Sequence, residues 1–308
     1  AMISAGLDDY KNGLDAHCCN KFNLFCNRYA NLLPPDVKKE MNQKEDAVAQ
    51  LGFLCDQCAE AGLKIYLFID EYDNFTNMIL SNEKHLVRYR KQTHGEGYLR
   101  KFFNTIKGAA GGSLARVFVT GVSPVTMDDL TSGFNIGTNY SLSPCFNDLT
   151  GFTEEEVREM LEYYTGILPF NHTIDELIGV MKPWYDNYCF AEEEYGKSTM
   201  YNSVMVLNFL TNYIDSGCRI PKKMVEPNIR MDYDKLRMLI RHDKNFSHDA
   251  SIIQDIVTKG FVTGRLVENF PAENINDPDN FLSLLFYFGM VTIDGEYKGG
   301  IKFVIPNE

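Results

Sequence analysis

The sequence of 308 residues lacks the features of several protein classes. No apolar run reaches the ~20 residues that a membrane-spanning helix needs. The N-terminus has no basic segment followed by a long apolar core, which a secretory signal peptide would require. Positive charge is scarce, because 30 Lys and Arg residues stand against 42 Asp and Glu residues and give a formal net charge of −12. This balance excludes a protein that works mainly as a polyelectrolyte clamp on nucleic acid, although it allows a local basic patch.

The composition is that of a folded protein with two or three packed units. Hydrophobic residues make up 44% of the chain, which is enough apolar material for real cores and excludes a disordered or low-complexity chain. The eight cysteines are scattered along the chain. We therefore expect free, mostly buried thiols and a cytoplasmic location.

Two apolar runs predict a parallel sheet in the first half of the chain. They cover residues 65–69 and 117–119, and a helical stretch over 97–108 separates them. Continuous apolar runs are typical of strands that are buried on both faces of a parallel sheet. We therefore expect a right-handed βαβ unit, with residues 140–142 as a third, short strand.

Helical patterns cover most of the remaining chain. The predicted helices span residues 7–33, 36–61, 174–181, 203–214, 232–241, 251–258 and 277–288. Pro34-Pro35 ends the first of them, and Thr153 is the N-cap of a further helix whose first turn holds three glutamates. The chain ends in MVTI, DGEYKGG and IKFVIP, which predicts a hairpin. A helix followed by such a two-stranded wing is the ending of a winged-helix module.

Polar residues follow both predicted strands, at the edge where open α/β sheets bind ligands. Asp70 and Glu71 come directly after the first apolar run. In P-loop nucleoside triphosphatases the first such acid orders Mg²⁺ and the second polarises the attacking water. Thr120 and Ser123 follow the second run, where such sites sense the γ-phosphate or place water. The structural alternative is a pair of strands that simply end in polar turns.

Six segments, in their order and spacing, resemble one protein family. FIDEYD, FVTGVSPV and SPCFNDLTGFTEEEV are followed by KPWYDNYCF, MYNSVMVLNFL and LLFYFGMVTIDG. This series, which covers residues 65–308, is similar to the AAA-ATPase-like family of bacterial and archaeal proteins. The resemblance implies a P-loop ATPase-like region, which many members combine with a following PD-(D/E)XK nuclease-like domain.

The resemblance also implies roles for individual residues. Asp70 and Glu71 match the Walker B acids, so Asp70 is expected to hold Mg²⁺ and Glu71 to act as the general base. Asp73 matches the family's second acid and is implied as a further group at the Mg²⁺. The sensor-like residues that the resemblance implies are Thr120, Ser123 and Arg158. A solvated arginine in an acidic helix is the alternative for the last of these.

The chain departs from the family where the phosphates should bind. No Gly-rich loop that ends in Gly-Lys-Ser precedes residue 65, although the N–H groups and the lysine of such a loop hold the β- and γ-phosphates. Gly196-Lys197-Ser198 is no substitute, because three glutamates precede it and no apolar strand leads into it. We expect either the middle of a longer protein, continuing before Met2 and after Glu308, or a naturally shortened relative. Mg²⁺ and ATP are expected for the intact protein, and this chain should bind neither tightly.

Two weaker patterns favour packing over chemistry. Cys55 and Cys58 form a CxxC, but no second Cys or His pair follows at a zinc-site spacing, so we expect buried helix cysteines. The aromatic residues of segment 184–190 could stack on bases, but a packing cluster is the simpler interpretation.

These observations predict an α/β protein with an incomplete P-loop (RecA/AAA-like) core of parallel strands. The core covers residues 1–150, a mostly helical lid 151–216, and a helical region with a winged-helix-like end 217–308. The predicted function is a fragment of an ATP-dependent switch protein, itself inactive without a P-loop, that could form a homo-oligomer and contacts no membrane. The alternative is a non-enzymatic module that binds protein or nucleic acid through its C-terminal half. Basic residues there include Lys222, Lys223 and Arg241.

Overall fold

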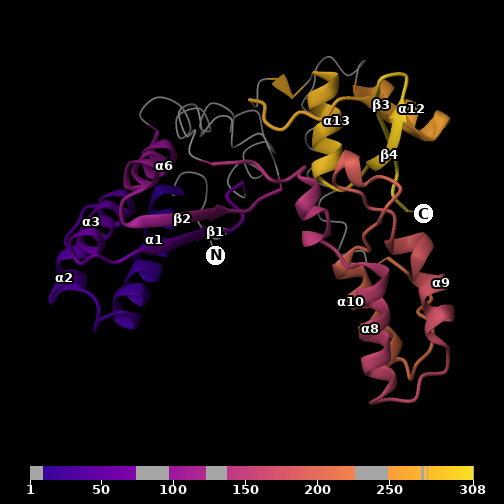
Figure 1. Cartoon of the computed structure of the whole chain (residues 1–308), viewed down its shortest axis with the longest axis horizontal. Helices are drawn as coiled ribbons and strands as arrows, with labels where there is room; N and C mark the ends of the chain where they lie inside the picture. The colour runs from indigo at the N-terminus through magenta and orange to yellow at the C-terminus, as the bar shows by residue number, and fades with distance from the viewer. Residues whose placement is uncertain are drawn as a thin grey trace. The chain divides into compact units, whose positions relative to one another are not determined.

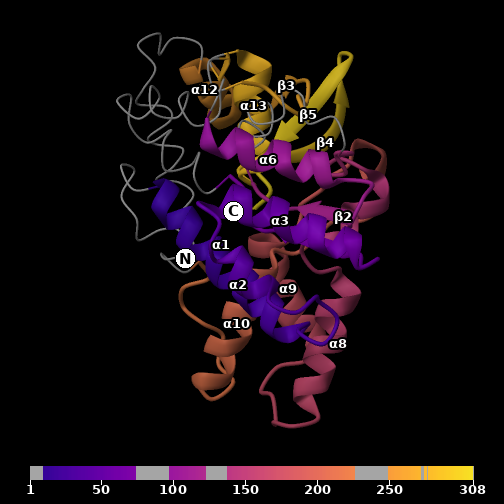
Figure 2. The same ribbon diagram turned by 90° about the vertical axis from the view of Figure 1, so that its left-hand side faces the viewer.

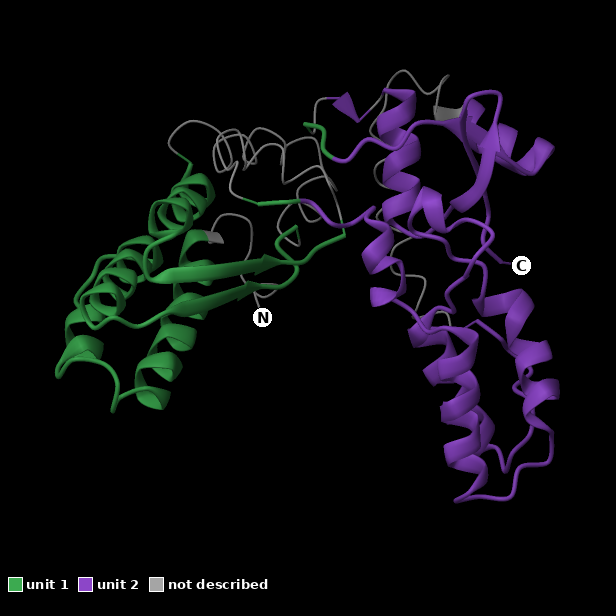
Figure 3. Cartoon of the chain, in the orientation of Figure 1, with its two compact units in different colours: residues 1–138, 269–272 green, residues 139–268, 273–308 purple. Residues whose placement is uncertain are grey.

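The computed structural model describes residues 10–73, 97–122, 137–225, 249–271, 274–275 and 277–307. The chain divides into two compact units (Figures 1 and 3). The first unit comprises residues 1–138 and 269–272, and the second comprises residues 139–268 and 273–308.

Three helices open the first unit, where the sequence predicts two. They are α1 (Tyr10–Arg28), α2 (Val37–Met41) and α3 (Ala47–Glu60). The helix predicted over 36–61 is interrupted because Asp46 is extended and its side chain accepts the N–H of Ala49 at 2.9 Å, which begins α3 anew. These helices share one core, whose buried side chains are Cys26, Leu33, Val37, Met41, Leu54 and Cys58.

Two strands, β1 (Ile65–Ile69) and β2 (Leu114–Val119), pair in parallel in the first unit, as predicted. Helix α6 (Tyr98–Ala109) lies between them in the chain and packs beside α3 (Figure 2). Phe68 is opposite Phe118 in the register of the pair. Because the strands are parallel, their carboxyl ends lie at one edge of the sheet.

The expectation that both strands are buried on two faces is wrong. Burial alternates along β1, so that its isoleucines and leucine are half-buried while Tyr66 and Phe68 are 65% and 74% exposed. On β2, Phe118 is 53% exposed, and its ring meets that of Phe68 edge to face at 6.2 Å between centroids. An apolar run therefore does not distinguish a strand covered on both faces from one covered on a single face.

The third strand predicted at 140–142 does not form. Tyr140 is irregular, and Ser141 and Leu142 form a turn. The Asn139 side chain accepts the backbone N–H of Ser141 at 3.0 Å, and such local bonds compete with strand pairing. A short 3₁₀-helix, η3 (Pro144–Leu149), follows at once.

Three helices form one part of the second unit: α8 (Glu154–Thr165), α9 (Ile174–Tyr185) and α10 (Ser203–Asp215). They enclose a core of Val157, Leu161, Leu177, Met181, Tyr185, Phe209 and Tyr213, against which Trp184 packs half-buried. The predicted helices over 174–181 and 203–214 are thus confirmed, and that over 232–241 lies outside the described residues.

Both α8 and α9 begin with a capping box. Thr153 accepts the N–H of Glu156, whose carboxylate accepts the N–H of Thr153, and Thr173 and Glu176 repeat the arrangement. The N-cap predicted at Thr153 is confirmed. These boxes fix where each helix begins independently of its packing.

The other part of the second unit packs two helices against a small antiparallel sheet. Its elements are α12 (Asp249–Lys259), β3 (Val262–Gly264), α13 (Pro278–Tyr287), β4 (Thr292–Tyr297) and β5 (Gly300–Val304). The strand order is β3-β5-β4, so the predicted C-terminal hairpin is present and β3 pairs with its β5 edge. The core between them includes Ile252, Ile256, Phe281, Leu285, Ile293 and Phe303.

Candidate functional site

Asp70 and Thr120 meet at the carboxyl edge of the parallel sheet. Each residue directly follows its strand, and the Thr120 hydroxyl donates a hydrogen bond to Asp70 Oδ1 at 2.5 Å. The strand ends are also joined by the backbone, because the Thr120 N–H donates to the Ile69 carbonyl at 2.8 Å. The parallel register therefore brings together two residues that are 50 positions apart in the sequence.

The chain turns sharply after Asp70. Glu71 has φ 54°, in the left-handed region that side chains other than glycine rarely occupy. The next residue, Tyr72, returns to the sheet edge and donates its N–H to the Thr120 carbonyl at 3.0 Å. This turn leaves the carboxylates of Asp70 and Glu71 exposed at the same edge.

Asp73 differs from these two acids because it is only 2% exposed. Its Oδ2 accepts the N–H of Val122, in the turn after β2, at 3.1 Å. Gly121 allows this approach: a Cβ there would lie 2.3 Å from the Tyr72 ring and 2.7 Å from Asp73 Oδ1. The sequence alone did not reveal this contact; the signal was a glycine two residues after the end of one strand and an acid four residues after the end of the neighbouring strand.

The edge carries a carboxylate that could hold a hydrated divalent cation. Carboxylate oxygens are ligands that Mg²⁺ prefers, and Asp70 is exposed with one oxygen oriented by Thr120. Within the described ranges no cluster of three or more His, Cys, Asp or Glu side chains could hold a metal ion on its own. A Mg²⁺ here would keep several waters and would need phosphate oxygens, as is usual for this ion.

Comparison with protein families finds a match in the first unit. Residues 2–131 match the family AAA-ATPase_like, described as "Predicted AAA-ATPase". This region of the chain is similar to that family. No curated protein and no solved structure matches the chain. The match includes Asp70, Glu71, Asp73 and Thr120, and it supports the suspected resemblance over the first two of its six segments, FIDEYD and FVTGVSPV.

The remaining candidate residues from the sequence have different surroundings. Arg158 lies on α8 in the second unit, where its guanidinium contacts Glu154 at 3.1 Å and Asp175 at 2.6 Å. These contacts tie α8 to the start of α9. Lys222 and Lys223 are exposed, whereas Ser123 and Arg241 lie outside the described residues.

Several patterns that the sequence analysis set aside have structural roles. Gly196 lies in a turn at φ 75°, after the 3₁₀-helix η4 (Glu192–Glu194), and Lys197 pairs with Glu194 at 3.0 Å. Cys55 and Cys58 are 2% and 0% exposed on α3, and burial raises the pKa of the Cys58 thiol to about 11. A solvated turn and buried helix cysteines are the interpretations that the structure confirms.

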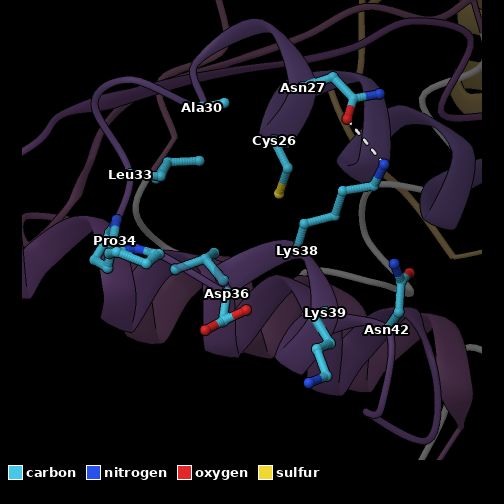
Figure 4. Close-up of a pocket in the computed structure, with 11 residues that line it drawn as sticks. Cys26, Asn27, Ala30, Leu33, Pro34, Asp36, Lys38, Lys39 and Asn42 are labelled. Atoms are coloured by element: carbon cyan, nitrogen blue, oxygen red, sulfur yellow. Dashed lines mark hydrogen bonds between the residues drawn. The ribbon is translucent and has the colours of Figure 1, made fainter.

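A hollow of about 420 Å³ lies between α1 and α2 in the first unit (Figure 4). Lys38 lines it and donates to Asn27 Oδ1 at 2.9 Å, so its charge is directed at a neutral amide. Neither Asp70 nor Thr120 lines the hollow. It is therefore separate from the sheet-edge site.

Among the described helices, none combines the length and apolar composition needed to cross a membrane.

Proposed function

We propose that this chain is part of an ATP-dependent switch protein, whose nucleotide site uses the sheet edge at Asp70 and Thr120. The observation that supports the proposal best is the hydrogen bond from Thr120 to Asp70, which fixes an exposed carboxylate at the carboxyl ends of two adjacent parallel strands. A bound Mg²⁺ would neutralise charge on the transferred phosphate. Asp70 would hold it through water, and Glu71 would take the proton of the attacking water.

Phosphate binding is the part of the site that this chain does not supply. The sequence has no Gly-rich loop with the N–H groups and lysine that surround the β- and γ-phosphates. We propose that such a loop belongs to an intact protein and that this chain alone has negligible ATPase activity.

Phosphate release from ATP tests both statements. This chain should release no more phosphate than its Glu71→Gln variant does. A longer natural form with a Gly-Lys-Ser loop should hydrolyse ATP and lose ~10²–10⁴-fold of that activity in Glu71→Gln, the range expected for a general base. Glu155→Gln, at an exposed acid on α8, is the matched control and should stay active.

Turnover by the present chain that Glu71→Gln abolishes would contradict the predicted inactivity. Equal activity of the longer form with and without the Glu71→Gln substitution would remove the role of Glu71.

A second candidate function is binding through a winged-helix-like C-terminal unit. The order α12, β3, α13, β4, β5, with β5 in the middle of the sheet, is the arrangement that supports it. Helix α13 is a poor reader of nucleic acid, because seven consecutive residues, 280–286, are buried and the helix has no basic residue. Binding of nucleic acid by this part of the chain would therefore depend on Lys222, Lys223 and Arg241.

Fluorescence anisotropy with a labelled duplex at low salt tests this candidate. Neutralising Lys222, Lys223 and Arg241 together should weaken binding and flatten its salt dependence, whereas Asp70→Ala should leave both unchanged. Binding that is unaffected by the three neutralisations would remove the basic-patch version of the proposal.

A further inference from the structure

We infer that Asp73 is a positioning residue that joins the turn after β2 to the turn after β1, and that it is not a Mg²⁺ ligand. Family resemblance places it with the metal-binding acids, so this assignment changes its role. The consequence for Glu71 rests on the proposed function, whereas the contact itself does not.

The surroundings of the Asp73 carboxylate favour this positioning role, in which Asp73 acts as a brace between the two turns. Asp73 is 2% exposed, while Asp70 in the same turn is exposed. Oδ2 accepts the N–H of Val122 at 3.1 Å, and Oδ1 lies 2.7 Å from the point where a Cβ on Gly121 would be. Both oxygens therefore face the backbone of the second turn. Hydrated Mg²⁺ needs room for several waters, and a carboxylate that is 2% exposed does not offer that room.

The contact completes a short ladder between the two turns. Thr120 binds Asp70 through its hydroxyl and Tyr72 through its carbonyl, and Val122 then binds Asp73. Glu71 lies in the chain between the contacts of Asp70 and those of Tyr72 and Asp73. Its φ of 54° is unfavourable for a side-chain-bearing residue, and such a conformation persists only when the surrounding structure imposes it. Tyr72 and Asp73 both attach the chain that follows Glu71 to the second turn, so we expect Asp73 to help set where the Glu71 carboxylate lies.

Hydrogen exchange at the Val122 amide, measured by NMR on the full chain, tests the assignment. Asp73→Ala removes the acceptor and should speed exchange of this amide about 5- to 10-fold, as expected for one hydrogen bond of ordinary strength. Asp73→Asn keeps an acceptor oxygen and should restore exchange to within about 2-fold of the wild type. Asp56→Asn, at an exposed acid on α3, controls for the change in charge and should have no effect.

The effect of millimolar Mg²⁺ on exchange of the Val122 amide distinguishes a brace from a Mg²⁺ ligand. If Asp73 is a brace, the wild type and Asp73→Asn respond identically to Mg²⁺, and an absent response in both also fits. A Mg²⁺ response that the wild type shows and Asp73→Asn lacks would overturn the assignment, as would an Asn variant that exchanges as fast as Asp73→Ala. If Asp73→Ala does not fold, the comparison of Asp73→Asn with the wild type still decides. No ATP is used, so failure here and failure of the ATPase proposal are distinguishable.

Discussion

Replacing Gly121 with alanine should destabilise the first unit through a steric clash and not through backbone strain. Gly121 does not have a positive φ, so alanine is acceptable to its backbone. Its new Cβ, however, would lie 2.3 and 2.4 Å from two ring atoms of Tyr72, where ordinary contacts begin near 3.4 Å. The ring must move by roughly 1 Å, and forcing an extra carbon into such a contact costs about 1–3 kcal/mol. The displacement would also strain the Val122–Asp73 hydrogen bond beside it.

Gly108→Ala is the matched control, because the same substitution should there have the opposite sign. Gly108 lies in the last turn of α6, and a Cβ at this position would meet nothing within 4 Å. Alanine should stabilise the helix by up to about 1 kcal/mol. Urea unfolding followed by far-UV circular dichroism, with hydrogen exchange over β1 and β2, measures both variants.

A double-mutant cycle identifies the cause of the loss. In a Tyr72→Ala background the ring is gone, so the cost of Gly121→Ala should fall by about 1 kcal/mol or more. If Gly121→Ala is as stable as Gly108→Ala, or if its cost is the same with and without the Tyr72 ring, the steric argument is wrong.

Other predictions concern stability and reactivity. Tyr98→Phe removes a hydroxyl that donates to the Asp15 carboxylate and should destabilise the first unit by about 1.5–3 kcal/mol in urea unfolding; an unchanged midpoint would contradict this. Burial raises the pKa of Tyr185 to about 12, above the ~10 of an unfolded tyrosine, so this side chain contributes stability that is complete below pH ~10 and is lost as the pH rises toward 12. Urea midpoints across that range should fall less steeply in Tyr185→Phe. A thiol reagent should modify exposed Cys145 rapidly, whereas buried Cys58 should react only on unfolding, as peptide mass spectrometry of a time course would show.

Local sequence signals predicted the elements of the fold well. The run 65–69, the Thr153 cap and the C-terminal hairpin each depend on neighbouring residues, and the structure confirms all three. The break at Asp46 was missed because the preceding residues are compatible with a helix, and the decision rests on one side chain capping α3. Burial of the strands on a single face depends on what packs over the sheet, which a run of apolar letters does not encode.

In the candidate site, too, the sequence predicted some contacts and not others. Pairing of Asp70 with Thr120 follows from two polar residues at the ends of adjacent parallel strands, which the sequence revealed. The roles of Asp73 and Gly121 could not be predicted, because they depend on how closely two turns approach each other in space. The family resemblance implied a metal-binding role for Asp73, and the burial of its side chain, which the sequence does not show, distinguishes it from Asp70.

The single tryptophan of the chain, Trp184, packs against the core of α8, α9 and α10 in the second unit. Its fluorescence emission therefore reports on that unit, and the first unit contributes only tyrosine emission. Comparing the tryptophan signal with the helical circular dichroism signal should resolve the unfolding of the two units in one sample, without any label. The same comparison would show whether a substitution at the sheet edge acts within its own unit or is transmitted to the other.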